Sequence, residues 1–225
     1  MGQDNQPKKR QASQIIRKQG RRASYDRILI VSEGSKTEPH YFGEIRSYYK
    51  LHSANVQVQP GAWGTQPLQV VEFAEQLFLK GDANKSIQPR AFEQVYAVFD
   101  RDDHATYHAA LAKAAALRSK LRNDLGAHVK FEAIPSVPCF EIWLLLHFED
   151  VLASLHRTEV YRRLRAYLQG YDKGQAGHFA ATRTQLDAAS QRAQHLAEQF
   201  DAHDAMHPYT DIHRLVNLLA ALKGG

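Results

Sequence analysis

The sequence predicts an α/β fold: a mostly parallel sheet flanked by helices, followed by a helical C-terminal part. The first observation is two continuous apolar runs, at 27–32 and 93–100, of the kind found in strands buried on both faces. The second is the alternation of strand and helix patterns through residues 27–136, an order that favours a parallel sheet. The third is a helical pattern from residue 151 onward, with polar breaks at 170–177.

Local signals justify the individual elements. Pro39 suits the first turn of a helix, where its missing N–H has no intrahelical partner to lose. An amphipathic pattern stops at Gly81, a residue type that often ends helices. An alanine-rich stretch predicts one long helix that ends at Gly126. The expected elements are strand 27–32, helix 38–50, strand 55–60, helix 67–81, strand 93–100, helix 104–126, strand 127–136 and a short apolar segment at 139–150.

The chain divides into three parts. We expect a basic flexible arm at 1–24, an α/β core at 25–150 and a helical C-terminal extension at 151–225 that packs on the core. Residues 1–22 hold seven basic side chains and one acidic one, which leaves 22 basic and 23 acidic side chains in the rest of the chain. A basic arm can bind nucleic-acid phosphates. A solvated, disordered tail has the same composition, so both interpretations stay open.

The composition excludes several classes of protein. At 44% hydrophobic and 24% charged residues, the chain has the make-up of a globular protein. The single cysteine, Cys139, allows no intrachain disulfide and no cysteine-based metal cage, which suits a reducing cytosol. No apolar run approaches the ~20 residues that span a bilayer, and the first residues lack the apolar core of a secretory signal. We therefore expect a cytoplasmic protein without a membrane partner.

Acidic side chains stand at the ends of both strong strands. Glu33 follows the first strand, and Asp100 and Asp102 follow the second. Residues i and i+2 of an extended chain point to the same side, and ligands of parallel sheets bind where the strands end. If the two strands are neighbours, three carboxylates converge, and their repulsion favours a bound Mg²⁺, with Mn²⁺ as a substitute. Alternatively, Asp100, Asp102 and Asp103 cap a helix that begins near His104.

Several stretches together resemble the RloB family, whose members have a Toprim-like fold. They are "ILIVSEGSKTEPHYF" (28–42), "VYAVFDRDDH" (95–104), "IPSVPCFEIWLLLHF" (134–148), "YDK" (171–173) and "HPYTDIHRLV" (207–216), in this order along nearly the whole chain. The resemblance implies a Toprim-like Rossmannoid sheet, Mg²⁺-dependent phosphodiester chemistry and a role in bacterial phage-defence loci. It also implies that Glu33 is a ligand or general acid/base and that Asp100 and Asp102 are ligands.

Two further acids are candidates for the same site. Many Toprim proteins carry an acid four residues after the glutamate; here Thr37 holds that position and Glu38 follows it. Glu38 is either a substitute ligand or a residue that favours the start of a helix. Glu141 lies within an apolar segment, where a carboxylate is costly unless it is paired or bound to metal. It is either a further ligand or base, or an exposed residue on the polar stripe of its helix.

Five basic residues are candidates for contacts with nucleic acid. Lys36 and Lys173 could contact phosphates. Arg162 and Arg165 share one face of a predicted helix with aromatic residues interleaved, a combination that suits a nucleic-acid backbone with exposed bases. A solvated helix face explains the same run equally well. His213 follows a turn that, by the resemblance, lines the substrate side.

The sequence thus predicts a Mg²⁺-dependent Toprim-type nuclease that cleaves RNA, transfer RNA included, or DNA in anti-phage defence. One alternative is a nucleotidyl transferase of the primase type. The other is a non-catalytic subunit that senses nucleic acid or nucleotides for an ATPase complex. The sequence carries no ATPase pattern, so any motor is expected to be a separate partner, and assembly into a homo-oligomer stays open.

Overall fold

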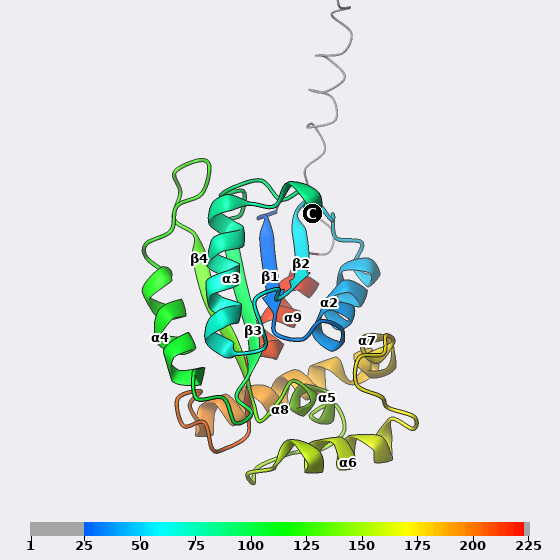
Figure 1. The fold of residues 1–225 in the computed structure, drawn as a ribbon. Coiled ribbons are helices and arrows are strands. Elements are labelled where there is room, and N and C mark those ends of the chain that lie inside the picture. The colour runs from blue at the N-terminus through cyan, green and yellow to red at the C-terminus, as the bar shows by residue number, and fades with distance from the viewer. Residues whose placement is uncertain (1–24, 223–225) are drawn as a thin grey trace, which may run out of the picture.

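The predicted α/β fold is confirmed. The structure is a computed structural model that describes residues 25–222, so the predicted basic arm at 1–24 lies outside the described residues. Within residues 25–222, five strands form one sheet in the order β2-β1-β3-β4-β5 (Figure 1). The first four run parallel, and the last is antiparallel to β4. The strands are β1 (Ile28–Ser32), β2 (Val56–Pro60), β3 (Gln94–Asp100), β4 (Lys130–Val137) and β5 (Tyr209–Thr210).

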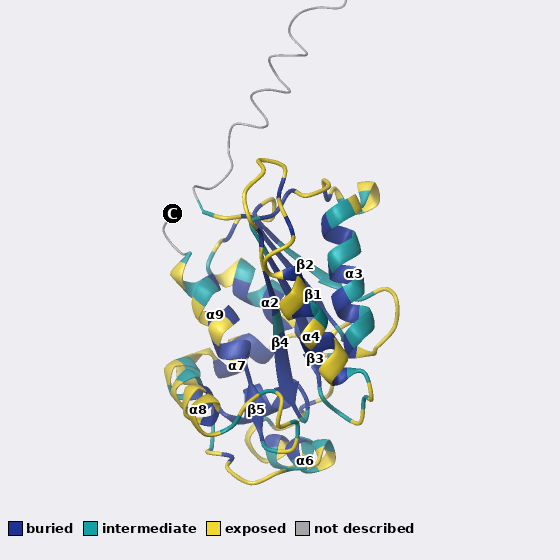
Figure 2. Ribbon diagram, turned by 90° about the vertical axis from the view of Figure 1, so that its left-hand side faces the viewer, coloured by how far each residue is buried: buried dark blue, intermediate teal, exposed yellow. Residues whose placement is uncertain are grey.

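Helices cover both faces of the sheet. Alternate residues of β1 point to opposite faces, so that Leu29 and Val31 pack under α3 and α4 while Ile28 and Ile30 pack under α2 and α9. Figure 2 shows the buried strands between these two layers. The helices are α2 (Thr37–Tyr48), α3 (Pro67–Lys80), α4 (Tyr107–Leu117), α5 (Glu141–Leu145), α6 (Arg157–Tyr167), α7 (His178–Thr182), α8 (Leu186–Gln199) and α9 (Ile212–Ala221), with short 3-10 turns η1 (Ala83–Lys85) and η2 (Arg183–Gln185).

The C-terminal part is mostly helical, as expected, but it also adds a strand to the sheet. Thr210 and Tyr209 pair with Ser136 and Val137 at the end of β4. Helix α9 then crosses the face of the sheet that α2 also covers. The sequence gives no strand signal here, because β5 is only two residues long. Residues after 151 therefore share their hydrophobic core with the N-terminal strands.

The prediction of one long helix at 104–126 is wrong, because α4 ends at Leu117. A tight loop follows it, in which the Asn123 side chain accepts hydrogen bonds from the N–H groups of Leu125 and Ala127 at 3.0 and 2.9 Å. Asparagine competes with helical hydrogen bonding in this way. Leu125, in this loop, is 81% exposed.

An ion-pair network closes the end of the sheet where the strands begin. The Arg27 guanidinium contacts Glu93 at 2.5 Å and Asp124 at 2.7 Å, and Arg27 itself is buried. We expect Arg27→Met to lower the free energy of unfolding by about 2 kcal/mol, because it removes the buried counter-charge of the half-buried Glu93. Urea denaturation measures the change. Arg122→Met, on an exposed side chain of the nearby loop, is the control, and an equal effect of both variants would contradict this role.

Candidate active site

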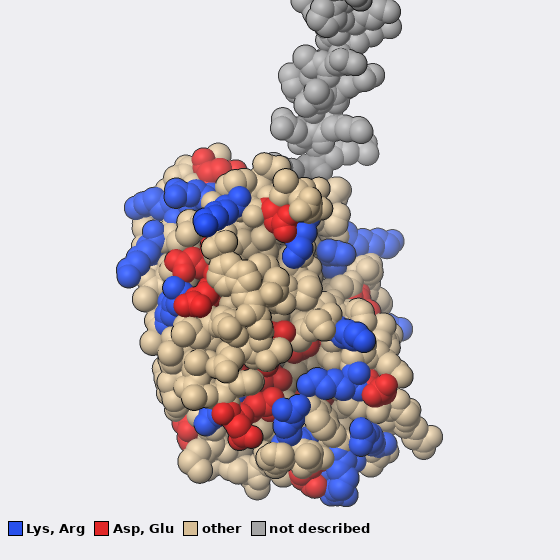
Figure 3. Space-filling model, viewed as in Figure 1, with Lys and Arg blue, Asp and Glu red and all other residues tan. Residues whose placement is uncertain are grey.

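A pocket of about 470 Å³ opens where β1 and β3 end. Four carboxylates line it, from Glu33, Glu38, Asp100 and Asp102. On the molecular surface, acidic side chains form a band across the lower middle of this face, near the ends of the strands, with lysine and arginine side chains beside them (Figure 3). The remaining lining residues are Gly34, Ser35, Gly61, Gly64, Thr65, His104, Arg157 and Lys173.

The strand register brings Glu33 to Asp100. β1 lies directly beside β3, and the Glu33 N–H donates to the Val98 carbonyl at 2.8 Å. Oε2 of Glu33 then accepts a hydrogen bond from the backbone N–H of Asp100 at 3.0 Å. Burial raises the Glu33 pKa to about 7, and the charges of Glu38 and Asp102 add to the rise. The expectation that these two strands are neighbours is therefore confirmed.

Asp100 and Glu38 are the two buried carboxylates of the four. Asp100 is 4% exposed, and its pKa lies well above the ordinary value because of burial and then the charges of Glu38 and Glu33. A group of like charges in a buried pocket is costly without a counter-charge. The Asp100 carboxylate is thus in an environment that favours either a proton or a bound cation.

Asp102 reaches the pocket by a different route from the one its spacing predicts. Its φ of +32° places it outside the extended strand, so the i, i+2 rule does not apply to it. Its N–H donates to the Pro138 carbonyl at 2.9 Å, which holds the turn against the end of β4. Oδ2 of Asp102 pairs with Arg157 Nη1 at 2.7 Å, while the buried Oδ1 has no hydrogen-bond partner among the residues described.

Glu38 comes from the first turn of α2 and is 4% exposed. Burial raises its pKa to about 7 against hydrogen bonds from the backbone, and the charge of Glu141 adds to the rise. A side chain at Gly34 would overlap the Glu38 carboxylate, which explains why a glycine follows Glu33. Glu38 therefore lines the pocket beside Glu33, although Thr37, the residue before it, does not.

Glu141 lies behind the pocket instead of lining it. It is fully buried in α5, which excludes the exposed polar stripe considered from the sequence. Oε1 accepts a hydrogen bond from the Tyr171 hydroxyl at 2.8 Å, and Oε2 has no hydrogen-bond partner within the described part of the chain. Glu141 also raises the pKa of Lys173, in opposition to the effect of burial. Its place is behind the four lining carboxylates, beside the lysine.

Three basic side chains face the acids. Lys173 and Arg157 both lie over the Tyr161 ring, at 5.8 and 5.9 Å from its centre, so one aromatic ring positions two cations. His104 Nε2 lies 3.4 Å from Glu33 Oε1. Lys173 was predicted as a site residue, whereas Arg157 and His104 were not. Arg157 was visible only as one member of an arginine-rich run, and the sequence does not say which member turns inward.

The other predicted nucleic-acid contacts line none of the pockets described. The exposed Lys36 lies against Gly174, in the loop that carries Lys173. Arg162 pairs with Glu159 on the outer face of α6, and Arg165 is exposed on the same helix. His213 is buried in α9, with its Nδ1 3.1 Å from the Thr210 carbonyl, and burial lowers its pKa.

The oxygen-rich pocket fits a hard divalent cation in the chemistry of its ligands. Carboxylate oxygens are the ligands that Mg²⁺ prefers, and the unpartnered Oδ1 of Asp102 is one such oxygen inside the site. As the side chains stand, no three His, Cys, Asp or Glu residues within 25–222 lie close enough together to hold a metal ion. Glu33 is turned to the Asp100 N–H and Asp102 to Arg157, so cation binding would require these side chains to rotate.

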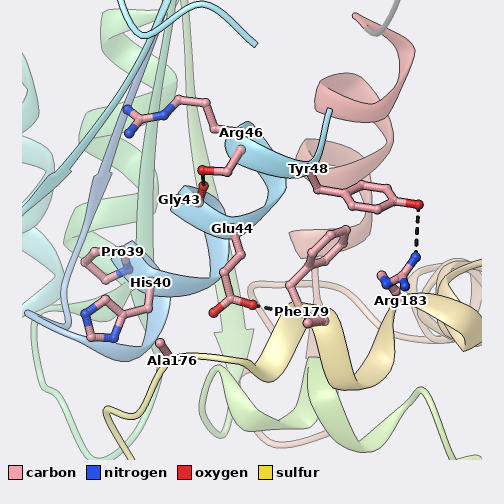
Figure 4. Close-up of a pocket in the computed structure, with 11 residues that line it drawn as sticks. Pro39, His40, Gly43, Glu44, Arg46, Tyr48, Ala176, Phe179 and Arg183 are labelled. Atoms are coloured by element: carbon pink, nitrogen blue, oxygen red, sulfur yellow. Dashed lines mark hydrogen bonds between the residues drawn. The ribbon is translucent and has the colours of Figure 1, made fainter. Parts of the chain in front are cut away.

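A separate groove of about 450 Å³ lies between α2 and α7 (Figure 4). Glu44 accepts hydrogen bonds from the N–H groups of Gly177 and Ala180 at 2.5 and 3.2 Å, and Arg183 donates to the Tyr48 hydroxyl at 3.0 Å. These contacts join the two helices. The groove has no described lining residue in common with the carboxylate pocket.

The fold and the pocket define a mostly parallel α/β protein with a carboxylate cluster at the ends of its strands. The family described as RloB-like protein matches residues 28–219. The chain belongs to this RloB-like family, as the resemblance of its motifs indicated. No curated protein and no solved structure matches the chain. None of the helices within residues 25–222 is both long enough and apolar enough to cross a membrane.

Proposed function

We propose that this protein is a Mg²⁺-dependent nuclease that cleaves phosphodiester bonds in RNA or DNA. The observation that carries the proposal is the convergence of four carboxylates and the cations Arg157 and Lys173 in one pocket at the strand ends. Carboxylates suit a divalent cation and the basic side chains suit a phosphate. A site for phosphodiester chemistry needs both kinds of group within one pocket.

Each residue has a role in this proposal. Glu33, Asp100 and Asp102 would hold Mg²⁺, with Mn²⁺ as a substitute. A cation there would supply charge stabilisation at the phosphate and lower the pKa of an attacking water. Lys173 and Arg157 bind the phosphate oxygens and orient the substrate. Glu38, whose pKa is about 7, takes a proton at its carboxylate near neutral pH. The charge of Glu141 favours the protonated form of Lys173.

The biological setting follows from the family resemblance and belongs to the same proposal. The protein acts in anti-phage defence in the bacterial cytoplasm, with nucleic acid as its partner and, where a motor is required, a separate ATPase subunit. The nuclease is expected to be of the Toprim type. Arg162 and Arg165 on the outer face of α6 hold more distant parts of the nucleic-acid backbone.

Cleavage assays test the function directly. Purified full-length protein is incubated with total RNA and with plasmid DNA, in Mg²⁺, in Mn²⁺ or in excess EDTA, and the cut ends are mapped. We expect cleavage with either cation and none with EDTA, because the carboxylates need a metal ion to act on the phosphate. Mapped ends then identify the substrate class.

Two results would contradict the nuclease. Tight binding of nucleic acid without cleavage in either cation would favour the non-catalytic sensor. Extension of a primer when labelled nucleotides and a template are supplied would favour the primase-type nucleotidyl transferase. The length of the labelled product separates this reaction from cleavage.

A further inference from the structure

A second, smaller pocket shares a wall with the carboxylate pocket. It has a volume of about 210 Å³, and Asp102 and Arg157 line both pockets. The second pocket lies between the turn after β3, the end of β4 and the segment that leads into α6. The Asp102–Arg157 ion pair therefore forms a wall between two adjoining cavities.

Two guanidinium groups face this second pocket. Arg101 Nη1 donates to the Asp102 carbonyl at 2.6 Å, while its buried Nε has no hydrogen-bond partner within residues 25–222. Arg157 gives one hydrogen bond to Asp102, and a guanidinium has five N–H donors. Asp103 also lines the pocket and is exposed to solvent. The two arginines provide donors of the geometry that binds phosphate.

The lining of the pocket also has an apolar part. Leu155 is half-buried, and Met206 is 73% exposed. Methionine is flexible and polarisable, so it adapts to flat ligands. A ligand that matches this pocket has an anionic group for the arginines and an apolar face for Met206. A nucleotide unit combines a phosphate with a base in this way.

We propose that the second pocket binds the nucleotide unit adjacent to the scissile phosphodiester, with Arg101 and Arg157 on its phosphate and Leu155 and Met206 against its base. This inference rests on the proposed nuclease function, because the carboxylate pocket defines where the scissile bond lies. The Asp102–Arg157 ion pair then lies between the scissile phosphodiester in the carboxylate pocket and the nucleotide unit in the second pocket. Arg157 contacts the phosphate between them, and Asp102 faces the reacting side.

Binding measurements test the pocket without the need for cleavage. Fluorescence anisotropy follows labelled single-stranded RNA and DNA of about twelve nucleotides, a length within the usual site size of a single-strand binding groove. The protein is the full chain carrying Asp100→Asn, in Mg²⁺, so that the substrate stays intact. Three variants are added to this background: Met206→Glu, Arg101→Gln and, as the matched control, Leu125→Glu. Leu125 is 81% exposed and lies in the loop before β4, at the opposite end of the sheet.

We expect Met206→Glu to weaken binding about tenfold, because it replaces the apolar contact with the base by a charged side chain and adds a negative charge to a site for a polyanion. Arg101→Gln is expected to weaken binding and to reduce the slope of log K against log salt concentration by roughly 0.7, the value for one lost phosphate contact on a single strand. Leu125→Glu should leave the affinity unchanged. A purely structural role of Arg101 would lower affinity without this change in slope.

Equal affinities for all three variants would overturn the second pocket, and so would the absence of any oligonucleotide binding. The nuclease proposal fails by a different observation, the absence of cleavage by the unmodified protein in Mg²⁺ and Mn²⁺. The unmodified protein could fail to cleave while Met206→Glu still weakens binding. The second pocket would then be supported as a nucleotide-binding site, and the catalytic role of the carboxylates would be rejected.

Discussion

Asp100→Asn is expected to reduce cleavage about a hundred- to a thousandfold and, at the same time, to stabilise the protein in the absence of metal. The activity falls because a neutral amide is a poor ligand for Mg²⁺ and leaves charge at the phosphate unbalanced. The stability rises because Asp100 is buried among Glu38 and Glu33, which oppose its ionisation. Removing about 1 kcal/mol of repulsion raises the melting temperature by about 2–4 °C for a chain of this size.

Cleavage rates and thermal melts in EDTA measure the two effects on the same preparation. Asp150→Asn is the matched control, because Asp150 is an exposed aspartate that only approaches Arg192 at 3.5 Å. We expect it to change neither quantity. Undiminished cleavage by Asp100→Asn would remove the catalytic assignment. Lost cleavage together with a lower melting temperature would instead indicate that Asp100 supports the fold.

The opposite signs of the two effects distinguish a functional carboxylate from a structural one. Arg27, Glu93 and Asp124 form a network in which opposite charges compensate each other, so any loss destabilises the fold. In the carboxylate pocket the acids outnumber the nearby cations and raise each other's pKa. Charges that oppose folding and yet stand at the end of a sheet are typical of a site selected for binding or chemistry.

The parallel sheet could be predicted because its strands are buried on both faces and therefore continuously apolar. The same rule fails for β5, which has only two residues and gains its place from pairing with β4. The predicted end of the long helix at Gly126 was wrong for a related reason. Local propensity favoured continuation, whereas the Asn123 side chain stabilises a loop that leads directly into β4.

The sequence predicts those site residues that stand at the ends of parallel strands. Glu33 and Asp100 follow from the rule that parallel strands end at one edge, and the structure places them in contact. Asp102 lines the pocket for a reason that the sequence did not reveal, since its backbone has left the extended conformation. Arg157 and His104 lie outside any strand, so only the packing of helix and turn could bring them to the pocket.

The contribution of Glu33 and Glu38 to the stability of the metal-free protein is expected to fall as the pH rises from about 4.5 through about 7. The pKa of each carboxyl in the folded protein is about 7, above the ordinary value of 4.5. The folded state therefore binds these protons more tightly than the unfolded state does. Their contribution is fully present below about pH 4.5 and is lost as the pH rises through about 7, with an effect on the order of 3 kcal/mol for one such group.

Comparison with the Glu33→Gln/Glu38→Gln double variant isolates this effect. Other acids act in the opposite direction, since Arg27 lowers the pKa of Glu93, but they are common to both proteins and cancel. Urea denaturation in EDTA at pH 5 and pH 7.5 should show the variant becoming more stable relative to the unmodified protein as the pH rises. Parallel pH profiles would contradict the raised pKa values of these two buried carboxyl groups.

Addition of Mg²⁺ should remove most of that difference near neutral pH. A cation that binds the folded state alone stabilises it by mass action, and it does so only when the carboxylates are ionised. The unmodified protein should therefore gain stability with Mg²⁺ at pH 7.5 and gain little at pH 5, whereas the double variant should respond at neither pH. Equal gains in the two proteins would mean that Mg²⁺ acts elsewhere, and the pocket would then hold protons instead of a metal ion.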